Sequence, residues 1–200
     1  MITIMKQQAS LAGVTPLARA LLAGNYLFRQ GDPTFGIFLL RSGRVRLQRI
    51  TPDGTAVSIH LARPGETFAE ASLFSDVYHC DAVAEVAGEV LVYPKERLAE
   101  KLRSEPEALW AFARDLAVHL QKLRLRYEIK HLRAAPERVL QFLRLNCTAE
   151  AVFPVNGALK DVAAELGLTP EAFYRALALL EKRRIVVRSA GAIRLTGHMN

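Results

Sequence analysis

The chain has 200 residues and a mass of 22.2 kDa, which allows one large domain or two small ones, each with its own core. Half of the residues are hydrophobic and 24% are charged, and no apolar stretch is long enough for a transmembrane helix. The two cysteines, Cys80 and Cys147, are too few for a disulfide framework or a four-cysteine metal centre. Residues 1–8 lack the pattern of a secretory signal, so we expect a reducing, cytoplasmic location without membrane attachment.

Basic residues outnumber acidic ones. Lysine and arginine together number 27 and aspartate and glutamate 20, which gives a formal net charge of +7 and an isoelectric point near 9.7. The surplus is densest in the last third of the chain, where five cations fall between Lys182 and Arg194. This balance favours a polyanionic partner but does not identify it.

The first half of the chain has the alternation and turn residues of short strands. Strands are predicted at residues 36–40, 44–49, 57–61, 82–86 and 90–93. In the second of them Val45 and Leu47 share one face, and arginines occupy the other. Residues 51–54 are typical of a hairpin turn, and Gly88 is expected to separate the last two strands. Short strands at this spacing predict a small β sandwich or roll.

Helical periodicity begins after Tyr93. A short helix is predicted from residue 94 and a long one from residues 104–107, ending before Pro136. Apolar residues of the long helix recur at alternating spacings of four and three: Leu109, Ala113, Leu116, Leu120, Leu123 and Tyr127. This heptad seam is the predicted dimer interface, although such a stripe can also pack on the β domain of its own chain.

The last third is predicted to be helical until near its end. The expected helices are 136–145, 158–166 and 170–183, and the expected strands are 185–188 and 192–195 with a turn at Ala190 and Gly191. The break before Pro136 completes the predicted division into residues 1–104, 105–135 and 136–200.

Residues 160–181 have the form of a helix-turn-helix. Gly167 permits a left-handed turn after the first helix, Thr169 can cap the second, and Pro170 suits its first position. Ala163 is small where the two helices cross closely, and the face that they share is predicted to bury Leu166, Leu168, Phe173, Leu177 and Leu180. Glu171 and Arg175, four residues apart, then project together from the exposed N-terminal part of the second helix.

That projecting pair can read DNA bases. Arg175 can donate two hydrogen bonds to guanine O6 and N7, and Glu171 can accept one from cytosine N4. The alternative is an ordinary surface ion pair between residues i and i+4. The turn signature and the basic hairpin that follows favour the DNA interpretation. Cations suited to phosphate contacts, of which we expect about half to serve, are Lys182, Arg183, Arg184, Arg188 and Arg194.

Taken in order, these parts resemble the CRP/FNR superfamily of bacterial transcription regulators. The resemblance covers roughly residues 20–195 and rests on the segments 28–33, 36–40, 42–45, 64–70 and 166–169 and on Glu171-x-x-x-Arg175. It implies an α+β fold: an N-terminal double-stranded β-helix (β-roll) sensor domain, a long dimerisation helix and a C-terminal winged helix-turn-helix. It also implies a homodimer that binds a pseudo-palindromic operator in double-stranded DNA, bends it and contacts RNA polymerase.

The resemblance breaks down where an effector would bind. Members that bind cyclic AMP hold its ribose with Gly-Glu and its phosphate with Arg-Ser; here these positions carry Ala69-Glu70 and Cys80-Asp81. A phosphate would meet a carboxylate instead of a guanidinium, so a cyclic nucleotide is not expected and the effector is unknown or absent. The candidate pocket comprises Glu70, Ala71, Cys80, Asp81, Leu123 and Tyr127. Residues 1–30 contain no cysteine, which excludes the family's N-terminal iron–sulfur mode, and no cofactor is expected.

The second helix departs from the cyclic-AMP receptor pattern as well. Pro170 replaces a base-contacting arginine and Tyr174 replaces a small residue, so the sequence does not predict the bases of the outer half-site. It still predicts a contact between Arg175 and an inner G·C pair. The candidate DNA-binding residues are Thr169, Pro170, Glu171, Tyr174, Arg175, Lys182 and Arg188.

Other chemistry has weaker support. His79 and Cys80 could bind haem or a metal or sense oxidants, but nearby Asp76 and Asp81 do not activate a thiol, and the inert interpretation is favoured. The histidines form no catalytic motif, so no enzyme is predicted: His60, His79, His119, His131 and His198. The alternative function is a small-molecule-binding regulatory module that acts through a protein partner rather than DNA.

Overall fold

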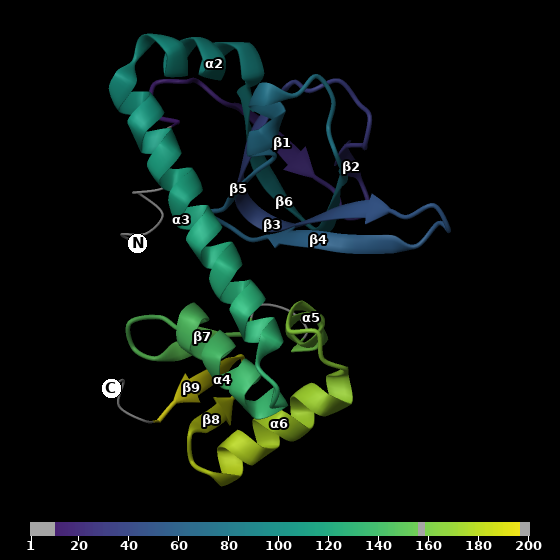
Figure 1. Ribbon diagram of the computed structural model, residues 1–200, viewed down its shortest axis with the longest axis vertical. Helices are drawn as coiled ribbons and strands as arrows, with labels where there is room; N and C mark the ends of the chain where they lie inside the picture. Colours follow the sequence, from purple (N-terminus) through teal and green to yellow (C-terminus); the bar gives the residue numbers. More distant parts are fainter. Residues whose placement is uncertain (1–10, 156–158, 197–200) are drawn as a thin grey trace. The chain divides into compact units, whose positions relative to one another are not determined.

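The computed structural model describes residues 11–155 and 159–196 (Figure 1). Residues 1–8, residue 158 at the predicted start of a helix, and His198 lie outside the described residues. The chain divides into two compact units, Met1–Ala117 and Val118–Asn200. This division falls inside the long helix, which the sequence-based division treats as a part of its own.

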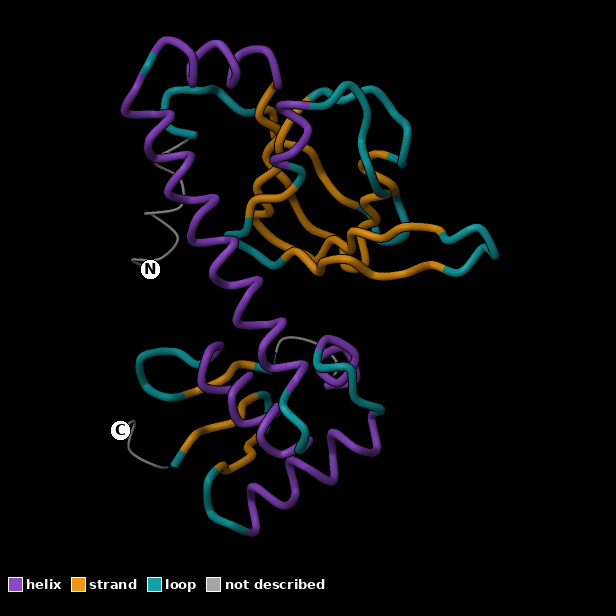
Figure 2. Tube along the Cα trace, in the orientation of Figure 1, coloured by secondary structure: helices purple, strands orange, loops and turns teal. Residues whose placement is uncertain are grey.

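The first unit is built on one antiparallel sheet whose strands curl around a common interior (Figure 2). The strands are β1 Leu17–Leu21, β2 Tyr26–Phe28, β3 Gly36–Ile50, β4 Ala56–Ala62, β5 Thr67–Phe68 and β6 Asp81–Pro94, with the short 3₁₀ helix η1, Glu70–Phe74, after β5. Their order is β1-β6-β3-β4, with β2 paired to β6 and β5 to β3. The expected β-roll is confirmed.

Aromatic rings fill the interior of this roll. Phe28 stacks on Tyr78 with ring centroids 3.7 Å apart, and Phe38 stacks on Phe68 at 5.1 Å. The Tyr78 hydroxyl donates to the Gly36 carbonyl at 3.0 Å, so its polar end is satisfied within the core. Burial raises the pKa of Tyr78 above its usual value, which keeps the hydroxyl protonated as a donor. The rings therefore contribute buried apolar surface to the core, and their stacking and the Tyr78 hydrogen bond fix their positions.

In two places, two strands predicted separately from the sequence form one continuous strand in the structure. Residues 36–40 and 44–49 belong to β3, whose pairing with β6 shifts register around Gly43. Residues 82–86 and 90–93 belong to β6, so the expected separation at Gly88 is wrong. Gly88 instead allows a close approach of two strands: an added Cβ would lie 2.2 Å from the Ser42 carbonyl oxygen.

Replacing Gly88 should therefore destabilise the roll. We expect Gly88→Ala to lower the free energy of unfolding by about 1–3 kcal/mol, because the methyl group overlaps the backbone of β3. Urea denaturation followed by circular dichroism measures the change. Gly54→Ala is the control, since its Cβ would meet open space and only the φ of +83° is unfavourable. A Gly88→Ala loss no larger than that of the control would contradict the close-approach argument.

Two helices follow the sheet. They are α2, Lys95–Ser104, and α3, Pro106–His131, and α3 begins where the proline in the first turn predicts. Leu98 and Leu102 of α2 and Ala108 and Phe112 of α3 are buried in one cluster with β3 residues such as Ile37. The start of α3 is thus anchored by apolar packing in the first unit. Among the described helices, none has both the length and the apolarity needed to cross a bilayer.

The second unit holds the rest of α3, three further helices and a small sheet. These elements are α4 Ala135–Asn146, β7 Val152–Pro154, α5 Leu159–Glu165, α6 Pro170–Lys182, β8 Val186–Ser189 and β9 Ala192–Leu195. The antiparallel order β7-β9-β8 places β9 in the middle. The predicted helices and hairpin of this unit are confirmed within a residue or two at the described ends. The strands β1, β2, β5 and β7 were not anticipated from the sequence.

Candidate nucleic-acid interface

The turn between α5 and α6 is formed by the residues the sequence proposed for it. Gly167 has a φ of +65°, the left-handed conformation that ends α5 without a Cβ penalty. The Thr169 side chain accepts a hydrogen bond from the Ala172 N–H at 3.2 Å, and α6 begins at Pro170. Local chemistry alone accounts for this turn.

Packing of α6 then determines which of its faces is free. Its buried residues join the core of the second unit: Phe173, Ala176, Leu177 and Leu180. Leu166, directly after α5, is buried in the same core, as predicted, and Leu168 is half-buried against it. Ala163 of α5 is buried there as well. The remaining face carries Glu171, Tyr174 and Arg175, all exposed. The two polar side chains thus lie one turn apart on the first turns of α6.

Glu171 and Arg175 are available for an external partner. Among the described residues, no ion pair involves either side chain, so the surface-pair alternative has no support in the geometry. The Glu171 backbone N–H and the Thr169 side chain hold the pKa of the Glu171 carboxyl below its usual value, and Arg175 adds to this. The carboxylate is therefore ionised at neutral pH and can accept hydrogen bonds.

Basic residues lie at the end of α6, in the turn that follows and on the strands of the small hairpin. Lys182, Arg183, Arg184, Arg188 and Arg194 are all exposed. Arg188 of β8 differs from the others because its Nη2 lies 2.5 Å from Oε2 of Glu181, in the last turn of α6. The sequence-based interpretation missed this pair; the only available signal was a carboxylate seven residues before an arginine, across a turn.

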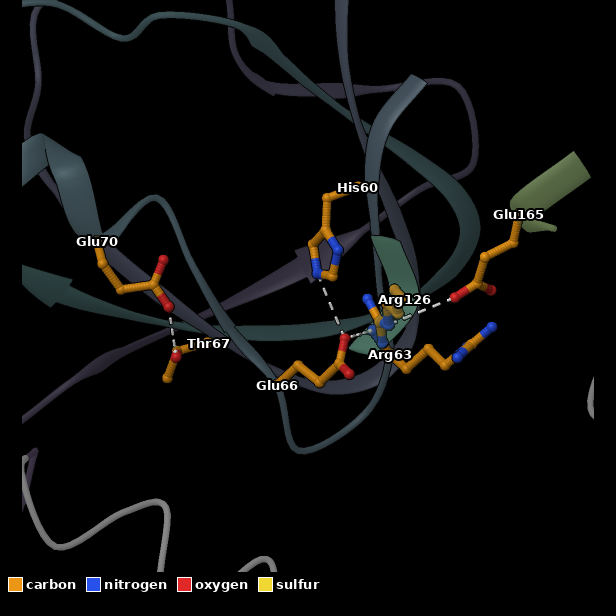
Figure 3. A network of polar contacts seen from close by, with 7 residues as sticks. All are labelled: His60, Arg63, Glu66, Thr67, Glu70, Arg126 and Glu165. Atoms are coloured by element: carbon orange, nitrogen blue, oxygen red, sulfur yellow. Dashed lines mark hydrogen bonds and ion pairs between the residues drawn. The ribbon is translucent and has the colours of Figure 1, made fainter. Parts of the chain in front are cut away.

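Polar contacts connect the end of α3 with the helix-turn-helix (Figure 3). Arg126 of α3 lies 3.6 Å from Glu165, the last residue of α5. Arg138 of α4 donates from Nε to the Leu132 carbonyl at 2.6 Å, just after α3 ends. These contacts attach α5 and α4 to the C-terminal part of α3 and the residue that follows it.

The heptad seam of α3 is exposed along its whole length. Leu109, Ala113, Leu116, Leu120, Leu123 and Tyr127 are all exposed, Leu120 by 48% and Tyr127 by 68%. The large apolar residues among them thus leave a contiguous stripe open on the single chain. This contrasts with Ala108 and Phe112, which the same helix buries in the first unit.

The candidate effector residues are divided between the two units. Glu70 in η1 accepts a hydrogen bond from Thr67 Oγ1 at 2.6 Å (Figure 3), and Ala71 beside it is exposed. Asp81 is buried, and its Oδ1 accepts from the Gln30 N–H at 2.8 Å. Both carboxylates therefore bind groups of their own chain. Leu123 and Tyr127 lie on the part of α3 that belongs to the second unit.

The cysteines show no activation. Burial raises the pKa of the Cys80 thiol, with nearby Arg49 opposing this and Asp81 adding to it. Burial also raises the pKa of the Cys147 thiol, which packs against the core of the second unit. Both thiols are therefore protonated at neutral pH. In the part of the chain that the structure describes, no group of three or more His, Cys, Asp or Glu residues could hold a metal ion.

The backbone before Glu70 retains a conformation that normally requires glycine. Ala69 has a φ of +64°, although the position carries alanine. We expect Ala69→Gly to raise the free energy of unfolding by about 0.5–1 kcal/mol, because glycine adopts this conformation without steric cost. Urea denaturation measures it, with Ala71→Gly in η1 as the control that should lose stability. Destabilisation by both substitutions would contradict the strain assigned to Ala69.

Comparisons with known proteins agree with this architecture. Residues 18–105 match the family model of the cyclic nucleotide-binding domain. The global nitrogen regulator of Nostoc sp. is 24% identical over 90% of this chain and 85% of its own length. The transcriptional activator protein Anr of Pseudomonas aeruginosa is 24% identical over 88% of this chain and 75% of its own length. The resemblance to the CRP/FNR superfamily of transcription regulators is confirmed.

A solved structure supports this fold over both units. FixK2 from Bradyrhizobium japonicum superposes with a TM-score of 0.75 at 19% identity, covering 91% of this chain and 93% of FixK2. The family model covers the β-roll, whereas the relatives and FixK2 extend through α3 and the helix-turn-helix. The similarity therefore extends over all the parts, in the order that the sequence motifs predict.

Proposed function

We propose that this chain is a homodimeric, sequence-specific transcription regulator that reads double-stranded DNA with α6 in the bacterial cytoplasm. The observation that carries the proposal is the exposed pair Glu171 and Arg175, held one turn apart on the first turns of a buried-face helix and engaged in no ion pair. A helix-turn-helix places this part of its second helix in the major groove. The regulator names of the Nostoc and Pseudomonas relatives support the same function.

In this proposal the residues around α6 have separate roles. Arg175 donates to guanine and Glu171 accepts from cytosine, which specifies sequence. The start of α6 would contact the DNA backbone and flanking bases through Thr169, Pro170 and Tyr174. Lys182 and Arg188 contact phosphates, which position the protein without specifying sequence.

The seam of α3 supports the homodimer. Two copies that bury this stripe present two α6 helices related by a two-fold axis, and such a pair matches a pseudo-palindromic operator. We propose residues 1–104 as the sensor, 105–135 as the dimerisation helix and 136–200 as the DNA-binding domain. Contact with RNA polymerase follows from the superfamily and belongs to the same proposal.

The sensor is proposed to work without a cyclic nucleotide. Asp81 accepts a backbone hydrogen bond and occupies the position expected for a phosphate-binding side chain, and it would repel an anion. Aromatic side chains fill the interior of the roll. The effector is therefore another molecule or is absent, and the proposed role is binding without catalysis.

Salt-dependent binding tests the function. Fluorescence anisotropy with a labelled duplex at several salt concentrations should give a strongly negative slope of log K against log salt, because each phosphate contact contributes about −0.9. Selection from random duplexes should then return a two-fold-symmetric site. Binding that is absent or insensitive to salt would overturn the proposal and favour a regulatory module that acts through a protein partner.

A further inference from the structure

The carboxylate of Glu181 makes two contacts with the wing, which is the hairpin of β8 and β9. Its Oε2 lies 2.5 Å from Nη2 of Arg188, and its Oε1 accepts the Arg188 backbone N–H at 3.2 Å. Glu181 stands in the last turn of α6, and Arg188 lies on β8, an edge strand of the small sheet. Both oxygens of one carboxylate are thus committed to a single residue of the wing.

This pairing is selective among the neighbouring cations. Four cations take part in no ion pair within the described residues, although all are exposed and the first three directly follow Glu181: Lys182, Arg183, Arg184 and Arg194. Arg188 holds the pKa of the Glu181 carboxyl below its usual value, so the carboxylate is charged at neutral pH. Of these five cations, Arg188 is therefore neutralised by a carboxylate of the protein itself, while in the described part of the chain the other four are not.

We propose that Glu181 competes with DNA phosphate for Arg188 and thereby weakens sequence-independent binding to DNA. This inference rests on the proposed function and adds a residue that tunes it. The Arg188 side chain is 42% exposed, so a phosphate can reach it, and an exposed ion pair is weak enough to exchange. A phosphate that displaces Glu181 leaves an unpaired carboxylate beside a polyanion, and this cost reduces the net gain of the contact.

The variant Glu181→Gln removes the charge of the carboxylate while keeping the size of the side chain and its hydrogen bond to the Arg188 N–H. The glutamine keeps an oxygen that can accept the Arg188 backbone N–H, so β8 stays attached to α6, but the ion pair is lost. We expect the affinity for a random-sequence duplex to rise on the order of two- to fivefold, the equivalent of one exposed ion pair. The slope of log K against log salt should become more negative by up to about 0.9.

A double-mutant cycle separates this exchange from a general charge effect. The cycle compares wild type, Glu181→Gln, Arg188→Gln and the double variant on the same random-sequence duplex. We expect Glu181→Gln to raise affinity only where Arg188 is present, and Arg188→Gln to cost more in the Glu181→Gln background than in wild type. Glu150→Gln removes an exposed charge elsewhere in the second unit and should raise affinity less.

Each other outcome overturns the inference. An equal effect of Glu181→Gln with and without Arg188, or one matched by Glu150→Gln, would mean that only net charge matters. A loss of affinity in Glu181→Gln would mean that the ion pair positions the wing for DNA. Failure of the wild type itself to bind the duplex with a negative salt slope would instead overturn the proposed function, so the two failures are distinguishable.

Discussion

Leu120→Glu is expected to convert the protein from a dimer to a monomer and to abolish tight operator binding. Leu120 stands in the middle of the exposed α3 seam, so a two-fold dimer would bury two facing carboxylates in an apolar interface. Desolvating each ion costs several kcal/mol without a partner, and we expect the dimer dissociation constant to rise at least about 1000-fold. Sedimentation velocity over a range of concentrations measures this change.

The monomer itself should remain folded. Leu120 is 48% exposed in the single chain, so the introduced carboxylate can stay in water. Gln121→Glu adds the same charge at an exposed position beside the seam and should leave the dimer intact. If the Leu120→Glu variant stays dimeric, or if the Gln121→Glu variant also dissociates, the seam is not the dimer interface.

Arg175→Ala is expected to cost about 1–3 kcal/mol of specific DNA binding, or roughly five- to 150-fold in affinity. The loss arises because a bidentate contact to guanine is removed from the exposed face of α6. Selection of binding sites from random duplexes should show relaxed preference at one base pair in each half-site, since Arg175 reads that pair.

Lys182→Ala provides the matched comparison. Lys182 is an exposed cation at the end of α6 that is assigned to phosphate. Its loss should weaken binding uniformly across sequences and make the salt slope less negative by about one unit, without altering the selected site. Unchanged sequence preference in Arg175→Ala would show that Arg175 does not read a base.

The fold and the exposed face of α6 could be predicted from sequence where short-range chemistry determines them. Gly167 and Thr169 act on groups only a few residues away, so the turn before α6 follows from residue type. The seam of α3 follows from apolar spacing along one helix. Glu171 and Arg175 share a face because residues four apart do so in any α-helix.

Contacts between distant segments could not be obtained in this way. Gly88 looked like a separator of strands, but tertiary pairing makes it the site where β6 approaches Ser42 of β3. Asp81 appeared to be a candidate ligand for an effector, yet it is bound to the N–H of Gln30, 51 residues away in the chain. Nothing in the local pattern of either residue encodes its partner.

The division between the two kinds of information is clearest in the wing. The cluster of cations from Lys182 to Arg194, the hairpin and the exposed face of α6 follow from composition and periodicity, which are properties of the chain alone. The pairing of Glu181 with Arg188, which leaves Lys182 and Arg194 exposed, is a result of tertiary folding. A charge is written in the sequence, but its partner depends on which side chains folding brings within ion-pair distance.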